Sequence, residues 1–223
     1  MRLPLTHRTS QHRSPDHIAE VIETSTSEFL AQCLEPEDLT FPEMPPFGSW
    51  VKAIDEESGN SIFGVVYHVT TAPIDSIHRA RALGLSLQEL REQQPQIFSM
   101  LKTEFRAAIV GFEVKAVARD GQVSTPATFY QHLPPRPPQI HQAVYCCDST
   151  EVLQFTEQVD FIRTLLQMTG TPVDALIAAT LREIYQLRQA DQQWLIQAGR
   201  SLNLMLREDY DRLRVILSQI YVS

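Results

Sequence analysis

The sequence predicts an α+β protein whose first half is built from β-strands and whose last third is helical. Short apolar runs rich in β-branched and aromatic residues recur as far as Cys146, and turn residues separate them. From Asp148 onward the spacing of apolar residues changes from two to about 3.6, which is the helical period. The 223 residues can bury a good core, in one large domain or two small ones.

The first half is organised around a predicted β-hairpin between Phe47 and Thr70. Gly48–Ala53 forms the rising strand, Ile62–Val69 the returning strand, and the polar residues at 55–60 connect them. Both strands contain strong strand formers that also bring large apolar area: Trp50, Phe63, Val65 and Tyr67.

A second hairpin is predicted upstream, between His17 and Leu34. Ile18 and Ile22 alternate with Glu and Ala residues, and an alternating run resumes at Phe29. A helix is the competing interpretation, because Glu, Ala and Leu are good helix formers. The four consecutive Ser and Thr residues at 24–27 weaken that helix, so strands are favoured.

A proline-rich loop over 35–46 and a helical insertion over 73–101 flank the central hairpin. The helical tract is expected to start near Ala72 and a first helix to end at Gly84. Ser86 stands where the N-cap of the next helix belongs, and Glu89 completes a capping box.

Further strands are predicted up to Cys146. Phe105–Val114 reads as a long strand with a bulge at Gly111, and Asp120-Gly121 marks a turn. Thr128–Leu133 and Ile140–Cys146 continue the sheet. Between them, the proline-rich run at 134–138 predicts an extended polyproline segment that crosses a barrel mouth.

Four helices are predicted after Asp148, either as a bundle or wrapped on the sheet. The first spans about 149–166, and Gly170-Thr171-Pro172 separates it from the second. The fourth either stands alone or extends the third. Their apolar positions are Val152, Phe155, Val159, Ile162, Leu165 and Leu166, then Val173, Leu176, Ile177, Leu181, Ile184 and Leu187, then Leu195, Ala198, Leu202, Met205 and Leu206, and last Tyr210, Leu213, Ile216, Leu217 and Ile220.

The net charge of −8 is distributed unevenly. Residues 1–15, a predicted disordered tail, carry three arginines and no acid. Residues 16–57 carry eleven acids against Lys52 alone, a balance of −10. Because a first half this acidic repels phosphate backbones, a basic protein surface is a better expected partner than nucleic acid.

Composition also bears on the compartment. No run approaches eighteen apolar residues, so no membrane span is expected, and the first residues lack the apolar core of a secretory signal. The three cysteines, Cys33, Cys146 and Cys147, form no disulfide framework and fit a reducing cytoplasm.

Motifs for catalysis or cofactor binding are absent from the sequence. There is no phosphate-binding P-loop, and the only lysines are at positions 52, 102 and 115. The seven histidines do not have the spacing of metal ligands, and adjacent Cys146 and Cys147 point to opposite faces of a strand. We therefore expect no cofactor, no metal and no catalytic residue.

Two charged groups are the candidate interaction surface. Asp55, Glu56 and Glu57 sit at the predicted hairpin tip, where they are expected to be solvated and to offer a docking edge. Three arginines recur every seven residues and form one basic stripe if their helix is continuous: Arg200, Arg207 and Arg214.

The strand order resembles a known family. Residues 18–29, IAEVIETSTSEF, are similar to the opening I-G-x-V-x-x-S-S-T-x-E-F of the HAS-barrel, the small β-barrel of hexameric DNA-pumping ATPases and rotary ATP synthase subunits. The hairpin of residues 47–70, the strand of residues 105–114 and the proline segment before residue 144 resemble later parts of that barrel. The overall texture of the chain is similar to that of the short stand-alone HAS-barrel proteins of cyanobacteria. The helical insertion and the helices in place of an ATPase domain depart from the ring-ATPase pattern.

The resemblance implies a six-stranded antiparallel β-barrel over 16–148, interrupted by the insertion and followed by a helical domain over 149–223. It also implies an assembly role without hydrolysis, and transfers no catalytic residue. The leading hypothesis is a non-catalytic adaptor that docks to a ring ATPase or its associated factor, with homo-oligomerisation expected. The alternatives are an enzyme with a pocket between barrel and helices and a nucleic-acid-binding accessory protein.

Overall fold

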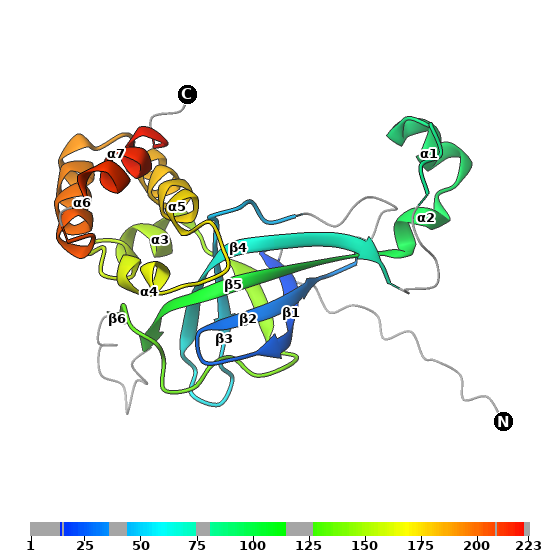
Figure 1. The fold of residues 1–223 in the computed structure, drawn as a ribbon. Helices are drawn as coiled ribbons and strands as arrows, with labels where there is room; N and C mark the ends of the chain where they lie inside the picture. The colour runs from blue at the N-terminus through cyan, green and yellow to red at the C-terminus, as the bar shows by residue number, and fades with distance from the viewer. Residues whose placement is uncertain are drawn as a thin grey trace.

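The computed structural model describes residues 14, 16–35, 44–74, 81–114, 127–207 and 209–220. Nearly all of the predicted tail, most of the loop at 35–46 and the turn at 119–122 lie outside these residues. Six strands pair antiparallel in the closed order β1-β2-β5-β4-β3-β7, which confirms the predicted barrel, and β6 adds to β5 (Figure 1). The strands are β1 His17–Thr24, β2 Glu28–Cys33, β3 Trp50–Ile54, β4 Ser61–Pro73, β5 Leu101–Val114, β6 Thr128–Tyr130 and β7 Ala143–Cys146.

The first hairpin consists of strands, as predicted. The residues that it buries, however, are not the isoleucines that are most apolar in the sequence of its first strand. Ala19 and Val21 lie in the barrel interior, whereas Ile18 and Ile22 are only half-buried, and Ile18 packs against the edge of that interior cluster. Large side chains such as Phe29 and Phe105 already occupy the interior, so a small residue packs well opposite them.

Strands β3 and β4 confirm the central hairpin and contribute to two cores. Val51 and Ala53 point into the barrel, while Trp50 points outward into a second cluster that includes the C-terminal helices. Residues 61–66 of β4 are all buried, because both faces of that strand are covered. Alternating apolar and polar residues are therefore absent from this part of the strand.

The predicted bulge at Gly111 is present in β5. Phe63 pairs with Gly111 and the next residue, Gly64, pairs with Ile109, so β5 has one extra residue at this point. Ile109 and Phe112 both lie in the barrel interior. They are three positions apart, which in a regular strand would place them on opposite faces, so the extra residue explains why they share one face. An added Cβ at Gly111 would collide with the Tyr130 carbonyl oxygen and lie 2.7 Å from Cζ of Phe155, so the position requires glycine.

The described residues of the insertion form two short helices, α1 Leu87–Gln93 and α2 Gln96–Ser99. The predicted capping box is confirmed: Ser86 accepts from the Glu89 backbone N–H, and the Glu89 carboxylate accepts from the Ser86 N–H at 2.8 Å. The helical start at Ala72 was wrong, because β4 continues to Pro73 in register with β5. Gly84 follows no helix in the described residues. The extended β4 and β5 hold the insertion away from the barrel (Figure 1).

The C-terminal part contains five helices: α3 Ser149–Phe155, α4 Ile162–Leu166, α5 Val173–Leu187, α6 Gln192–Met205 and α7 Tyr210–Ser218. The predicted single helix at 149–166 is two helices, because Gln131 occupies the break between them. Its side-chain amide donates to the carbonyls of Phe155 and Gln158 and accepts from the Phe161 N–H at 2.9 Å. No helix in the described part of the chain has the length and apolar character of a membrane span.

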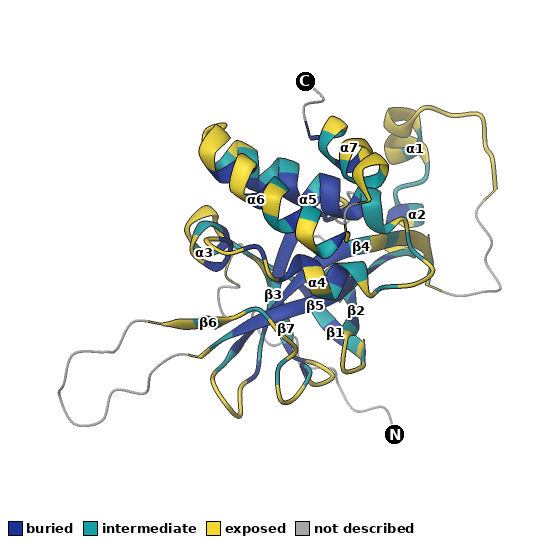
Figure 2. Ribbon diagram, turned by 60° about the vertical axis from the view of Figure 1, so that its left-hand side comes forward, coloured by how far each residue is buried: buried dark blue, intermediate teal, exposed yellow. Residues whose placement is uncertain are grey.

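The helices pack on the barrel through aromatic side chains. The ring of Phe155 stacks on Phe63 at 4.7 Å, and Trp50 meets Phe161 edge-on at 5.2 Å. The buried segments of β4 and β5 and the inner sides of the helices lie along this junction (Figure 2). The helices also pack against one another, so they form a group that contacts the barrel at one end (Figure 1).

We expect Gly111→Ala to destabilise the protein by about 2 kcal/mol or more, because the added methyl group pushes both β6 and the Phe155 ring away from position 111. Chemical denaturation measures this change in free energy of unfolding. Gly199→Ala on α6 is the control: an added Cβ there meets nothing closer than 3.9 Å, so helix propensity predicts a gain of about 1 kcal/mol. Equal effects of the two substitutions would contradict the packing described for β6.

Glu183 on α5 predicts a pH dependence of stability. Burial raises the pKa of its carboxyl from 4.5 to about 7, so the folded state holds a proton that the unfolded state releases. The protein therefore loses stability as pH rises from about 4.5 to about 7. Partial exposure reduces the effect, and Glu183→Gln should stabilise the protein by about 1–2 kcal/mol at pH 8 and have little effect at pH 4.5.

Denaturation at both pH values checks this expectation. Glu56→Gln, at an exposed position, is the matched control and should change little at either pH. An effect of Glu183→Gln that is the same at both pH values would show that the charge of Glu183 is not responsible.

Candidate functional site

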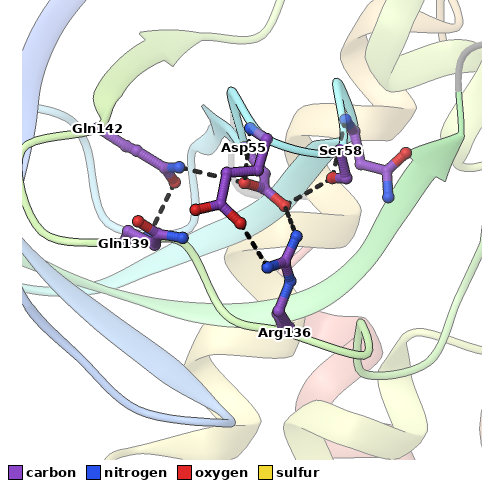
Figure 3. Close-up of polar contacts among 7 residues, drawn as sticks. Asp55, Ser58, Arg136, Gln139 and Gln142 are labelled. Atoms are coloured by element: carbon purple, nitrogen blue, oxygen red, sulfur yellow. Dashed lines mark hydrogen bonds and ion pairs between the residues drawn. The ribbon is translucent and has the colours of Figure 1, made fainter.

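The turn between β3 and β4 is the site of the predicted acidic docking edge. Asp55 follows β3 directly and is only 4% exposed. Its carboxylate accepts hydrogen bonds from Ser58 Oγ at 2.5 Å, from the Glu57 N–H at 3.2 Å and from Gln142 Nε2 at 3.3 Å (Figure 3). Arg136 Nη2 lies 3.4 Å from the same carboxylate. All these contacts converge on one buried acid.

Electrostatics explain why this buried acid keeps its charge. Burial disfavours the carboxylate, but the hydrogen bonds from Ser58, Gln142 and the Glu57 backbone, together with Arg136, outweigh it and lower the pKa of Asp55. The neighbouring Glu57 pairs with Arg136 at 2.6 Å. The turn and the segment before β7 are thus held together by charge-assisted contacts.

The three acids of the predicted docking edge therefore have different environments. The expectation of a solvated tip was wrong for Asp55, because residues some eighty positions away in the sequence cover it. Glu57 is exposed but engaged by Arg136. Glu56 is exposed and remains the accessible acid of the turn.

The three candidate arginines do not form one helical stripe. Arg200 lies on α6, Arg207 follows the end of that helix with a left-handed φ of 53°, and Arg214 lies on α7. Asp209 caps α7 by accepting from the Arg212 N–H at 3.1 Å, so a new helix starts there. The predicted basic stripe required one continuous helix. That helix is interrupted, so the three arginines lie on three separate segments.

Arg200 instead lies beside a surface groove between α6 and α7. This groove, hereafter the α6–α7 groove, has a volume of about 400 Å³. It is mainly apolar, and Ile196 and Tyr210 at its sides are 54% and 63% exposed. Gly199 and Asn203 line it from α6, and Leu213 lines it from α7.

A more polar cavity of about 350 Å³ lies between the barrel and α4. Glu28 and Tyr67 face it from the barrel, and Thr164 and Gln167 face it from the helices. The Glu28 carboxylate accepts hydrogen bonds from Tyr67 and, at 3.0 Å, from Arg106. Burial, together with the bond to Glu28, raises the pKa of Tyr67 to about 12, which keeps the phenol protonated at neutral pH.

The cysteines are poorly placed for thiolate chemistry. Burial, with a smaller effect of Cys146, raises the pKa of Cys33 to about 12, and burial also raises the pKa of Cys147 well above its ordinary value. Across the described ranges, no three His, Cys, Asp or Glu side chains gather as a metal site.

Comparison with protein families agrees with this architecture. Residues 18–115 match the family model of the HAS barrel domain. The chain contains a HAS barrel domain. No curated protein matches the chain. The matched range holds β1 to β5 and the insertion, while β7, which closes the barrel, lies beyond it.

The candidate residues divide between the HAS barrel and the helices. Asp55, Glu56 and Glu57 belong to the matched range, and Arg200, Arg207 and Arg214 lie outside it. Sequence reasoning missed Arg136 and Gln142 as partners of Asp55, because they lie about eighty residues further along the chain. A signal for the α6–α7 groove was present in Gly199, an interior helix glycine without a local turn to explain it.

Removal of the Asp55 carboxylate should weaken the HAS barrel. Asp55→Ala leaves Gln142, Ser58 and Arg136 without their shared acceptor, and we expect a loss of about 2–3 kcal/mol at neutral pH. The lowered pKa means that this contribution is present above pH 4 and fades as the carboxylate is protonated. The difference between wild type and variant should therefore shrink in acid.

Urea denaturation at pH 7 and in acid measures this difference. Glu56→Ala at the same turn is the matched control, with an expected effect below about 0.5 kcal/mol. A loss that is equally large for both alanine variants would contradict the role assigned to the buried carboxylate.

Proposed function

We propose that this protein is a non-catalytic adaptor or assembly factor that docks to a ring ATPase, or to a factor associated with one, through its HAS barrel. The observation that carries the proposal is the HAS barrel followed by helices in a sequence without a P-loop. The resemblance described above associates this barrel with assembly collars of ring ATPases. An assembly role fits a HAS barrel that is followed by helices.

The charged side chains of the barrel that form ion pairs hold parts of the structure together. Lys52 of β3 pairs with Glu151 at the start of α3, Arg106 pairs with Glu28, and Arg136 pairs with Asp55. Each ion pair joins separate segments of the chain. General acid–base catalysis favours a group whose pKa lies near neutrality, whereas the contacts of Asp55 and Tyr67 move their pKa values away from neutrality.

An enzyme with a site between barrel and helices is the second candidate, because the polar cavity beside Glu28 and Tyr67 lies at that junction. A small polar ligand would fit its volume and its hydroxyl and amide lining. Thermal shift measurements against a library of small metabolites distinguish the two candidates. Stabilisation that Tyr67→Phe abolishes would favour the enzyme or ligand-binding candidate.

Affinity purification from the native organism tests the adaptor. We expect the tagged full-length chain to capture a ring ATPase or its associated factor, and the purified components to bind each other again in isothermal titration. Glu56→Lys reverses the accessible charge of the β3–β4 turn and should weaken this binding at least tenfold. Glu92→Lys on α1 is the matched charge reversal at another exposed position and should leave the affinity unchanged.

Capture that yields neither an ATPase nor an associated factor, or a captured factor that fails to bind the purified chain, would overturn the proposal. Light scattering on the same samples measures the expected homo-oligomerisation. It also gives the stoichiometry of any complex.

A further inference from the structure

The α6–α7 groove is an open apolar surface made by two stripes of side chains. On α6 the lining residues are spaced as one helix face, from Leu195 through Gly199 to Asn203. On α7, Leu213 and Leu217 lie one turn apart and face them. Exposed apolar residues that gather in a groove mark interaction sites more often than scattered ones do. The shape is that of two helices with room for a third.

Gly199 is an unexpected residue on the floor of this groove. An interior helix glycine costs about 1 kcal/mol relative to alanine. No contact among the described residues requires it, since an added Cβ would meet only Leu217, at 3.9 Å, and the backbone φ is not left-handed. The missing side chain instead keeps the groove open, which allows another backbone to approach closely.

Arg200 adds a charge to one side of the groove. It is exposed, it is the one charged residue that lines the groove, and no acid in the described part of the chain pairs with it. The neighbouring helix positions three and four residues away hold Ile196, Gln197, Asn203 and Leu204, none of which is acidic. The groove is therefore apolar along its floor and positive at one edge.

We propose that the α6–α7 groove binds an amphipathic helix of a partner protein, with apolar side chains packed over Gly199 and an acidic side chain paired with Arg200. Charge complementarity sets the orientation of the helix, and the groove supplies the apolar area, as in other helix-in-groove complexes. The proposal goes beyond docking through the HAS barrel, since it concerns a separate surface for a second component.

Two synthetic helices test the groove. Each is a fluorescein-labelled peptide of about sixteen residues with leucines at i, i+3, i+4 and i+7, and it carries either glutamates or lysines along one edge. Fluorescence anisotropy with the full-length chain should give at least tenfold tighter binding of the glutamate peptide. Arg200→Gln should remove this preference, while Arg214→Gln, on the exposed face of α7, should retain it.

Gly199→Ala separates binding from folding. Because nothing within the chain crowds the added methyl group, the variant should have a melting temperature equal to or above that of wild type. It should nevertheless bind the glutamate peptide several-fold more weakly, and Gly199→Leu should abolish binding. A destabilised chain cannot explain weaker binding by a more stable variant.

Three outcomes of the peptide measurements would overturn the proposal. The first is no binding of either peptide, the second is equal binding of both, and the third is binding that Gly199→Leu leaves unchanged. A dimer in light scattering that Gly199→Leu dissociates would assign the groove to a second copy and would also overturn it. Capture of a ring ATPase through the HAS barrel is measured separately, so the two proposals fail or succeed independently.

Discussion

The aromatic contact between Trp50, Phe63, Phe155 and Phe161 is the interaction on which the arrangement of the two halves depends. Trp50 and Phe63 come from adjacent barrel strands, whereas Phe155 ends α3 and Phe161 precedes α4. Large aromatic side chains bury about 150–250 Å² each, so these four contribute a large apolar area between barrel and helices. Because β4 is buried on both faces, the barrel cannot expose its outer face without also losing the helical core.

The segment between β6 and β7 depends on that junction and in turn closes the barrel. Gln131 bonds to the break between α3 and α4, so the start of the segment is fixed by the helices. Arg136 and Gln142 then bind this segment to Asp55, the residue that follows β3. Strand β7 follows at once and pairs with β1 and β3. Residues beyond the range of the family match thus complete the barrel.

Local patterns predicted the elements that local energetics determine. The hairpin over 47–70 follows from its turn residues, and the Ser86–Glu89 capping box follows from hydrogen bonds between residues three positions apart. Both could therefore be predicted from the sequence. The burial of Asp55 depends on partners far along the chain, and a sequence pattern contains no signal for that distance. The arginine stripe failed for a related reason: a left-handed residue at Arg207 ends a helix that periodicity alone would continue.

The two surfaces proposed for binding lie on separate parts of the fold. The β3–β4 turn with exposed Glu56 belongs to the barrel, and the α6–α7 groove lies among the C-terminal helices. The aromatic junction between them is rigid, since packed cores transmit displacement with little compression. Partners bound at the two surfaces would therefore have a fixed orientation relative to each other.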